Sequence, residues 1–381
     1  MSKRILFVFK TPLLKCPRAR RLMLTLSKIH DCQYLCPPAL DEDNDPQRFG
    51  YLRRSPGSPF LRWLGRVATE SGWCHIAAHV EAKRFIMPTV VDGQFDYIFV
   101  HDLYLLPHFS NFRKTRVIFD AREYYPMEFS DNKAWAKTVG KLARHICLRH
   151  MPKVYRCITV SPSIVKLYEA LIGCPIGLFP SYPREDLYIS PQERPIEGRP
   201  IRLIHHGNAF RNRGLEKMIE LMAELGEGYS LDMMLVNTPG NKYFEELKQR
   251  IKGMKNVRII PPVHPDEIIE TCSEYDVGLY LMEVNDSQNR YCLPNKYFEF
   301  LYAGLPVITS FSEDMRYFTD KYGVGMSFGH ESVKQIAEQV RQLTPIKLQQ
   351  YRDAIKKHVV SLNVTNNIKT NFPELLDNKS G

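Results

Sequence analysis

The stretch RYCLPNKYFEFLYAGLPVITS, residues 290–310, places one carboxylate, Glu299, among aromatic side chains. Pro294 and Gly304 bound a run that fits a short helix, because proline suits the first helical position and glycine suits the end. On this helix Glu299 shares a narrow arc with Asn295 and Lys296, while the aromatic residues fill the wide arc. A carboxylate in this setting needs either water or a specific partner.

The start of this helix is suited to bind a nucleotide. The first N–H groups of a helix are free and its N-terminus is positive, so they can hold a phosphate. Glu299 lies about 6 Å further along the axis, where its carboxylate suits the two hydroxyls of a ribose. The other interpretation is an amphipathic helix whose Lys296 and Glu299 form a solvated ion pair. Spacing alone leaves both interpretations open.

The elements that would position this helix follow a regular order. Short apolar strands alternate with amphipathic helices, including one expected near residues 60–85, until the segment EDLYISPQERPIEGRP interrupts the pattern, which restarts at IRLIHHG. The strands lack alternation, which indicates parallel sheets covered on both faces. We therefore predict an α/β protein with two Rossmann-like, doubly wound domains that face a cleft, with ligands at the carboxyl ends of the strands.

The length of 381 residues agrees with two domains, because one ordinary core does not grow so large. We predict an N-terminal domain at 1–185, a linker at 186–200, a C-terminal domain at 201–345 and a helical tail at 346–381. The N-terminus MSKRILFVFKTP lacks the features of a signal peptide, and no apolar run approaches the roughly 18 residues that cross a bilayer. Nine cysteines without a CxxC pair indicate a reducing, cytoplasmic compartment.

The sequence argues against several types of cofactor and metal site. No GxGxxG follows a strand and no Walker loop is present, which argues against a dinucleotide oxidoreductase or a P-loop protein. Cys74, His75 and His79 fall on an expected helix without a fourth ligand nearby, so we expect packing and surface roles for them. The acidic stretch Asp41–Asp45 contains an Asp-x-Asp pattern, but it does not follow a strong strand, and we expect a solvated loop. We predict no metal and no cofactor.

The net charge of +10 predicts anionic partners. Residues 132–168 contain no acid, and Lys133, Lys137, Lys141 and Arg144 recur there at helical intervals with apolar residues between them. Such a helix is typical of peripheral contact with an anionic membrane, where each basic residue contributes ~1 kcal/mol. The alternative is a solvated basic face on a docked helix. We predict no nucleic-acid partner, because no recognition module is present.

The segment LPNKYFEFLYAGLPVI resembles the nucleotide-binding segment of GT-B glycosyltransferases of the retaining family 4 type, especially capsule and O-antigen members. The resemblance implies that Glu299 holds the donor ribose. It also implies that the backbone from Leu293 through Pro294 and Asn295 to Lys296 receives the diphosphate. The family usually has a second acid in the pattern E-x7-E. Here that place is Tyr291, so the usual contact to the donor sugar changes.

HHGNAFRNRGLEKMIELM resembles the strand, glycine loop and helix that open the family's second domain. The resemblance implies diphosphate contacts at Gly207 and Asn208 and catalytic roles for Arg213 and Arg211, although the family often has an arginine where Asn208 stands. It also implies a base-binding loop around Pro262 and Val263.

In the first half, DYIFVHDLYLLP and VIFDAREYYP resemble the family's His-Asp strand end and its D-x-H-E segment. The resemblance implies that His101 is a catalytic residue near the two sugars. Asp102, Arg122 and Glu123 would lie on the acceptor side, with Arg122 in the place of the family's histidine. A capping or core histidine is the alternative for His101.

These motifs together imply a hexosyltransferase-type enzyme that moves a sugar from a nucleotide sugar to a glycan or lipid-linked acceptor. The resemblance implies retention of configuration and a role in surface polysaccharide biosynthesis. It fits a cytoplasmic protein with peripheral contact at the inner face of the membrane. Two alternatives stay open: a nucleotide-sugar epimerase or hydrolase on the same scaffold, and a non-catalytic GT-B-like subunit. The departures at Asn208, Arg122 and Tyr291 favour the second alternative.

Overall fold

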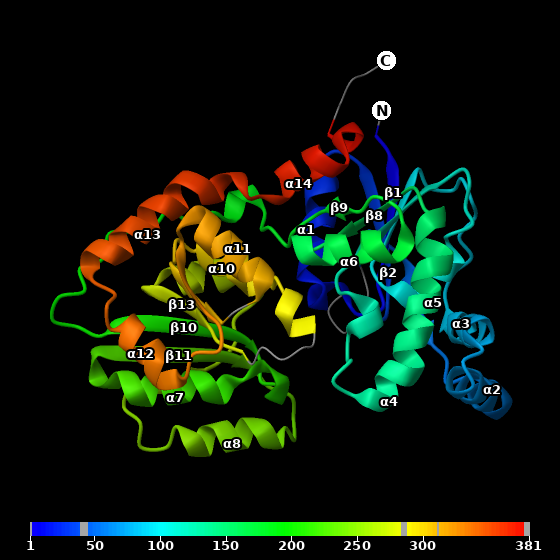
Figure 1. Cartoon of the computed structure of the whole chain (residues 1–381). Helices are drawn as coiled ribbons and strands as arrows, with labels where there is room; N and C mark the ends of the chain where they lie inside the picture. Colours follow the sequence, from blue (N-terminus) through cyan, green and yellow to red (C-terminus); the bar gives the residue numbers. More distant parts are fainter. Residues whose placement is uncertain (1, 39–44, 283–287, 311, 377–381) are drawn as a thin grey trace. The chain divides into compact units, whose positions relative to one another are not determined.

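The computed structural model describes residues 2–38, 45–282, 288–310 and 312–376 (Figure 1). The chain forms two compact units. Unit 1 holds Met1–Pro180, Asp286–Gln288 and Asn367–Gly381, and unit 2 holds Ser181–Asn285 and Asn289–Asn366. The chain therefore leaves unit 1, builds unit 2 and returns to unit 1 near its C-terminus. Residues 41–44 of the acidic stretch lie outside the described residues.

Unit 1 is built on a parallel sheet with the strand order β3-β2-β1-β6-β7-β8-β9. Its strands are β1 (Arg4–Val8), β2 (Asp31–Cys36), β3 (Arg48–Tyr51), β6 (Tyr97–Val100), β7 (Arg116–Ala121), β8 (Arg156–Thr159) and β9 (Gly177–Leu178). The central strands β1 and β6 are almost entirely buried, which agrees with a sheet that is covered on both faces. The strand order reverses between β1 and β6, so their carboxyl ends form a switch point.

Several helices accompany the unit 1 sheet: α1 (Pro17–Leu26), α2 (Pro59–Glu70), α3 (Cys74–Lys83), α4 (Lys133–Trp135), α5 (Lys141–His150), α6 (Pro162–Ile172) and the end of α14 (Val364–Asn371). A π-helical turn, Ala136–Gly140, joins α4 to α5. The single helix expected near residues 60–85 is two helices. Gly72 separates them with a φ of +75°, a conformation that ends a helix. The short strands β4 (Arg53–Arg54) and β5 (Phe85–Ile86) pair beside them.

Unit 2 has a parallel sheet in the order β12-β11-β10-β13-β14-β15. Its strands are β10 (Ile201–Asn208), β11 (Tyr229–Val236), β12 (Val257–Ile260), β13 (Val277–Tyr280), β14 (Val307–Ser310) and β15 (Gly325–Phe328). Its helices are α7 (Leu215–Leu225), α8 (Lys242–Arg250), α9 (Ile268–Ser273), α10 (Asn295–Tyr302), α11 (Glu313–Tyr322), α12 (Val333–Val340) and α13 (Pro345–His358). The order reverses between β10 and β13, which gives this unit its own switch point.

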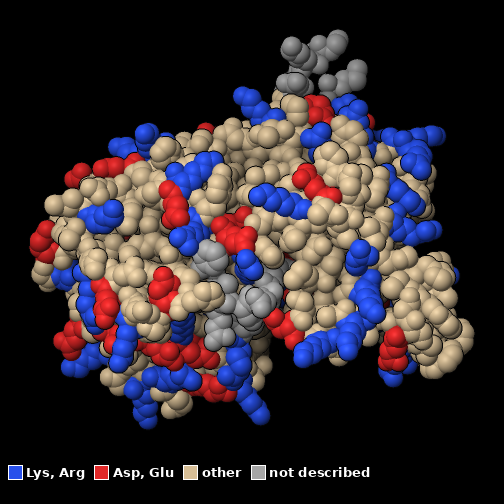
Figure 2. Space-filling view, in the orientation of Figure 1, with Lys and Arg blue, Asp and Glu red and all other residues tan. Residues whose placement is uncertain are grey.

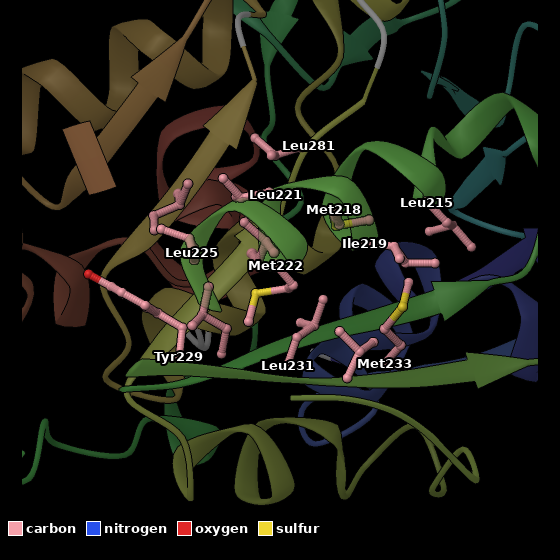
Figure 3. Close-up of a cluster of buried hydrophobic side chains, with 14 of the residues drawn as sticks. Leu215, Met218, Ile219, Leu221, Met222, Leu225, Tyr229, Leu231, Met233 and Leu281 are labelled. Atoms are coloured by element: carbon pink, nitrogen blue, oxygen red, sulfur yellow. The ribbon is translucent and has the colours of Figure 1, made fainter. Parts of the chain in front are cut away.

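Two hydrophobic clusters cover the two faces of the unit 2 sheet. One cluster packs α7 against strand residues such as Leu231 and Met233 (Figure 3). Successive side chains of a strand point to opposite faces. Leu279 of β13 therefore joins this first cluster, whereas Tyr280 joins the second cluster together with α10. This alternation brings Tyr280 to the same face of the sheet as α10, next to the end of β10.

Candidate functional site

The end of β10 and the start of α10 meet at the switch point of unit 2. Gly207 has a φ of +136°, and a Cβ atom at this residue would lie 2.7 Å from the ammonium nitrogen of Lys296. Only glycine therefore leaves room for the Lys296 side chain in this position. The predicted residues Gly207 and Lys296 are thus direct neighbours.

Lys296 and Arg213 converge on the same aromatic residue. The Lys296 nitrogen lies 4.4 Å from the centre of the Tyr280 ring. Arg213 donates a hydrogen bond of 3.4 Å from Nη1 to the Tyr280 hydroxyl. Burial, followed by the nearby charge of Arg213, lowers the pKa of Lys296 to about 7, although Glu299 acts in the opposite direction. A doubly charged anion between these cations would favour the charged form of Lys296.

The N-terminus of α10 adds a third positive element. Pro294 precedes the helix in an extended conformation, and its side chain makes no capping hydrogen bond to the first turn. The positive end of the helix dipole therefore lies beside the Lys296 side chain, which belongs to the same turn. Leu293 is buried just before this turn, and the side-chain oxygen of Asn295 is buried with no hydrogen-bond partner in the described chain.

Glu299 is buried, with only 4% of its surface exposed. Its Oε2 atom lies 3.4 Å from Nε2 of His206. His206 belongs to β10 and directly precedes Gly207. The His206 ring packs edge-on against Phe300 at a centroid distance of 5.1 Å, which fixes the ring. The interpretation of Glu299 as part of a solvated ion pair is therefore wrong. The carboxylate has a specific partner, and it is held within one helical turn of Lys296.

The other four residues of unit 2 with predicted roles are Arg211, Asn208, Pro262 and Val263. The side chain of Arg211 is 63% exposed and pairs with Glu246 at 2.6 Å. It also stacks on Tyr243, so its described contacts are with α7 and α8 rather than with Lys296. Asn208 is exposed at the end of β10. Pro262 and Val263 follow β12, two strands away from β10 in the sheet.

A second cluster lies at the switch point of unit 1. His101 follows β6 and is 1% exposed, and its Nδ1 atom lies 3.0 Å from Oδ2 of Asp120. Burial lowers the pKa of His101. A neutral ring whose Nδ1–H donates to Asp120 presents its other nitrogen, Nε2, as an acceptor. This nitrogen has no hydrogen-bond partner among the described residues. His101 is therefore buried but chemically suited to bind a hydroxyl group.

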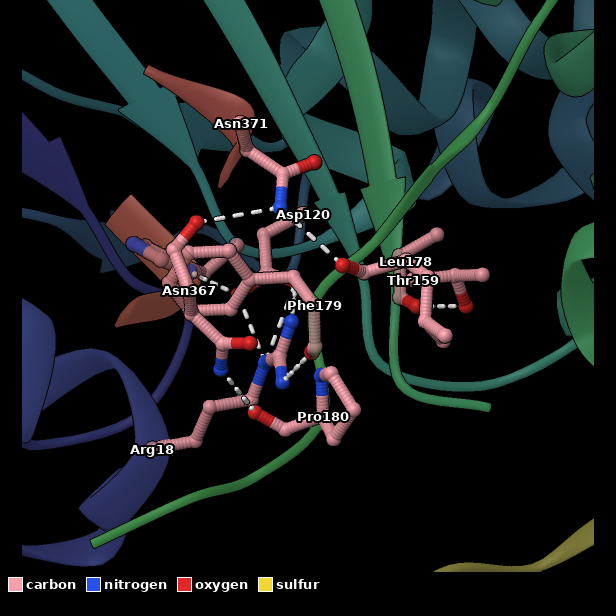
Figure 4. A network of polar contacts seen from close by, with 10 residues as sticks. Arg18, Asp120, Thr159, Leu178, Phe179, Pro180, Asn367 and Asn371 are labelled. Carbon is pink, nitrogen blue, oxygen red and sulfur yellow. Dashed lines mark hydrogen bonds and ion pairs between the residues drawn. The ribbon is translucent and has the colours of Figure 1, made fainter. Parts of the chain in front are cut away.

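Arg18 of α1 holds Asp120 in place (Figure 4). Its Nη2 atom donates to Oδ1 of Asp120 at 2.8 Å, its Nε atom also donates to this carboxylate, and its Nη1 atom donates to the Phe179 carbonyl. Burial alone would raise the pKa of Asp120. Arg18 and the hydrogen bond from His101 outweigh this effect and hold the pKa below its usual range. Asp120 thus stays ionised and fixes the orientation of His101.

The other predicted residues of unit 1 take mixed roles. Asp102 accepts a hydrogen bond from the Tyr104 backbone N–H at 2.9 Å and lies 3.5 Å from Lys10, so it caps the turn after β6. Arg122 follows β7, and its charge contributes to the lowered pKa of His101. The backbone carbonyl of Glu123 accepts a hydrogen bond from a buried tyrosine. His101, Asp102 and Arg122 therefore gather at neighbouring strand ends.

The structure places further residues at these two clusters, and two of them could have been found from the sequence. Asp120 is an acid inside the apolar strand VIFDA, and His206 is a polar residue at the end of an apolar strand. Arg18 and Tyr280 had no comparable signal. In the described parts of the chain, no group of three or more His, Cys, Asp or Glu side chains is placed to hold a metal ion. Within these same parts of the chain, each helix is too short or too polar to cross a membrane.

No protein-family model matches the sequence, and no curated protein matches it either. Solved structures do match. A sucrose-phosphate synthase from Thermosynechococcus elongatus is similar over 98% of each chain, with a TM-score of 0.72 and 13% identity. HepE from Anabaena, in complex with UDP and glucose, is similar over 98% of this chain and 99% of that chain, with a TM-score of 0.67 and 12% identity.

WaaG, a glycosyltransferase involved in lipopolysaccharide biosynthesis, is similar over 97% of this chain and 100% of that chain, with a TM-score of 0.63 and 13% identity. These structures have the GT-B architecture of two Rossmann-like domains. The fold predicted from the sequence is therefore confirmed: the chain is an α/β protein with the GT-B fold.

Proposed function

We propose that the protein is a glycosyltransferase that moves a sugar from a nucleotide-sugar donor to a glycan or lipid-linked acceptor. One observation carries the proposal. Lys296, Arg213 and the start of α10 surround one place beside Gly207, and Glu299 lies one turn away. A pyrophosphate fits the positive place, and the adjoining ribose fits the carboxylate. Structures with this fold have been solved with UDP-glucose or UDP-2-fluoro glucose, which supports the proposal.

The proposed chemistry uses the cations to stabilise the leaving group. Breaking the bond between sugar and phosphate builds negative charge on the departing oxygen. Arg213, Lys296 and the helix N-terminus stabilise this charge, and the loss of one such donor typically costs ~10²–10³ in rate. His206 is a positioning residue, because it holds the carboxylate of Glu299 toward the ribose. The incoming hydroxyl forms its bond to the anomeric carbon on the face from which the phosphate departs, and the departing phosphate oxygen takes its proton, so the sugar keeps its configuration.

Unit 1 would supply the acceptor side. His101 presents Nε2 as a hydrogen-bond acceptor, and Asp120 fixes the ring in that orientation. We propose that this nitrogen binds a hydroxyl group of a sugar and that Arg122 lies close to the acceptor. An acceptor that belongs to a surface polysaccharide under assembly fits this role, and a hexosyl donor fits the predicted enzyme type.

The first experiment is a thermal-stability screen of nucleotide sugars, because a bound donor stabilises the folded state. With the best donor, we expect Arg213→Ala to lower kcat by ~10²–10³, since the charge on the leaving oxygen loses one partner. Arg250→Ala, which removes an exposed arginine paired with Glu220 on the surface of unit 2, is the matched control. Unchanged turnover of the Arg213 variant at saturating donor removes the assignment. Release of free sugar without any acceptor requirement identifies a hydrolase instead.

A further inference from the structure

The basic helix segment of unit 1 presents its charges along one exposed line. Lys133, Lys137, Lys141 and Arg144 are all exposed, and none of them forms an ion pair within the described parts of the chain. The π-helical turn between α4 and α5 has more residues per turn than an α-helix, so residues four apart stay close to one line. Figure 2 shows the resulting blue stripe over α4 and α5. We call these four residues the basic stripe.

Two of the apolar residues of this same segment are covered by the protein itself. Leu142 and Ile146 are 6% and 1% exposed, because they pack into unit 1. The sequence left two interpretations open, an interfacial helix and a basic face on a docked helix. The burial of Leu142 and Ile146 agrees with a docked helix, whereas Trp135 and Val139 are half-buried. Most of the apolar contact with a membrane would therefore come from another element.

Helix α2 provides such apolar residues. Phe60 and Trp63 of this helix are 63% and 58% exposed, and Trp73, which follows it, is 53% exposed. The rings of Phe60 and Trp63 lie 6.0 Å apart, so they form a continuous aromatic surface. Ser58 caps the helix through the Leu61 N–H, which holds this surface in a defined helix. We call Phe60 and Trp63 the aromatic ridge.

The aromatic ridge and the basic stripe are neighbours. Helix α2 packs on α3 and also contacts the π-helical turn that carries Lys137. In Figure 2 the nearly uncharged surface at the position of α2 and α3 lies directly beside the blue stripe. Arg62 and Arg66 add two more exposed basic residues on α2 itself. Exposed aromatic residues beside unpaired basic residues form the pattern that binds the interface of an anionic bilayer.

We propose that the basic stripe and the aromatic ridge together bind the surface of an anionic lipid bilayer. The lysine and arginine side chains contact the headgroups, and the aromatic residues enter the boundary between headgroups and acyl chains. Each basic residue near such a surface contributes ~1 kcal/mol. A nucleic acid would satisfy the charges, but it would leave the aromatic ridge without a role. The inference rests on the surface of unit 1 alone and does not depend on the proposed transferase activity.

Intrinsic fluorescence gives a direct measurement. The chain has three tryptophans, Trp63, Trp73 and Trp135, and all of them lie on or beside this surface. We expect a blue shift of the emission when the full chain meets vesicles that contain phosphatidylglycerol. We expect little change with vesicles of phosphatidylcholine alone. The binding should weaken as salt rises, because salt screens the headgroup charge.

Two variants separate the contribution of the basic residues from that of the aromatic residues. Replacement of the basic stripe by glutamine should lower the affinity for anionic vesicles, measured by co-sedimentation, by about a hundredfold or more. The matched control replaces four exposed lysines of unit 2, Lys255, Lys334, Lys356 and Lys357, by glutamine and should bind nearly as the wild type does. Phe60→Ser with Trp63→Ser should remove the binding that persists at high salt. Ile346→Ser, at a residue that is 73% exposed in unit 2, should not.

Three results would overturn the proposal. The first is equal binding to neutral and anionic vesicles, and the second is equal loss of binding in the stripe variant and its control. The third is binding to an anionic polymer such as DNA without binding to vesicles. All substitutions are at exposed positions, so thermal unfolding of each variant should match the wild type and exclude misfolding.

Discussion

At the scale of single residues, Lys296 couples the protonation state of the protein to anion binding. Its pKa is lowered to about 7 by burial and by Arg213. A bound diphosphate stabilises the charged ammonium and raises this pKa again. Above pH 7, binding of a nucleoside diphosphate must therefore take up a proton, and the affinity must fall as the pH rises. Below pH 7 the ammonium is already charged, and this dependence disappears.

Calorimetry measures the proton uptake. Titration of the best-bound nucleoside diphosphate at pH 8, in two buffers with different heats of ionisation, should give different apparent enthalpies. Lys296→Arg is the control, because a guanidinium stays charged at this pH and takes up no proton on binding. The same proton uptake in the arginine variant would assign the effect to another group and contradict the prediction.

The sequence predicted those site residues whose geometry is local. Lys296 and Glu299 belong to one helix, and the rise per residue fixes their separation. His206 and Tyr280 come from other elements, and strand order decides that they meet α10. Nothing in the residues around Glu299 could predict the contact with His206. The sequence also could not predict that Arg211 pairs with Glu246, because this contact depends on the position of α8.

At the scale of elements, the contacts of Asp120 join α1, β7 and the end of β6. We expect Asp120→Asn to destabilise unit 1 by about 3–5 kcal/mol, because Arg18 then lies buried without its ionic partner. The ordinary pKa of an aspartate is about 4, and Asp120 lies below it in the folded protein. The stabilisation is therefore complete above about pH 4 and is lost as the pH falls further.

Denaturant unfolding followed by tryptophan fluorescence measures this loss. The double variant Arg18→Met with Asp120→Leu removes both charges together, and it should recover part of the stability because no unpaired charge remains. An Asp120 variant as stable as the wild type would show that the ion pair contributes nothing. The turnover of the double variant should stay low, because the His101 ring has lost the group that fixes its orientation.

The elements themselves were predicted best where they are long and buried. Strands such as β1 and β6 are nearly continuous apolar runs, and the structure confirms them. The break between α2 and α3 was missed, because a single glycine inside an apolar helical pattern gives a weak signal. The sequence also left open what covers the apolar face of α5. Periodicity shows that a face is apolar, but only the tertiary structure shows whether the protein or a membrane covers it.

At the scale of the whole molecule, the chain ends in the unit where it begins. Residues after α13 return to unit 1, where Asn367 and Asn371 donate hydrogen bonds to the Pro180 and Leu178 carbonyls (Figure 4). Phe372 is fully buried and packs edge-on against Phe99 of β6 at 5.6 Å. The C-terminal segment is thus a structural part of unit 1, although 187 positions in the sequence separate Asn367 from Pro180.

Phe372→Ala should therefore destabilise unit 1 by about 3–5 kcal/mol, the usual cost of removing a buried phenylalanine. All three tryptophans lie in unit 1, so their fluorescence reports the unfolding of this unit selectively. The lower midpoint should appear in that signal, while the affinity for a nucleoside diphosphate, which we place in unit 2, stays unchanged. A chain that ends after Leu376 keeps every contact named above and is the control. If the fluorescence midpoint of the Phe372 variant equals that of this control, the C-terminal segment is dispensable for unit 1.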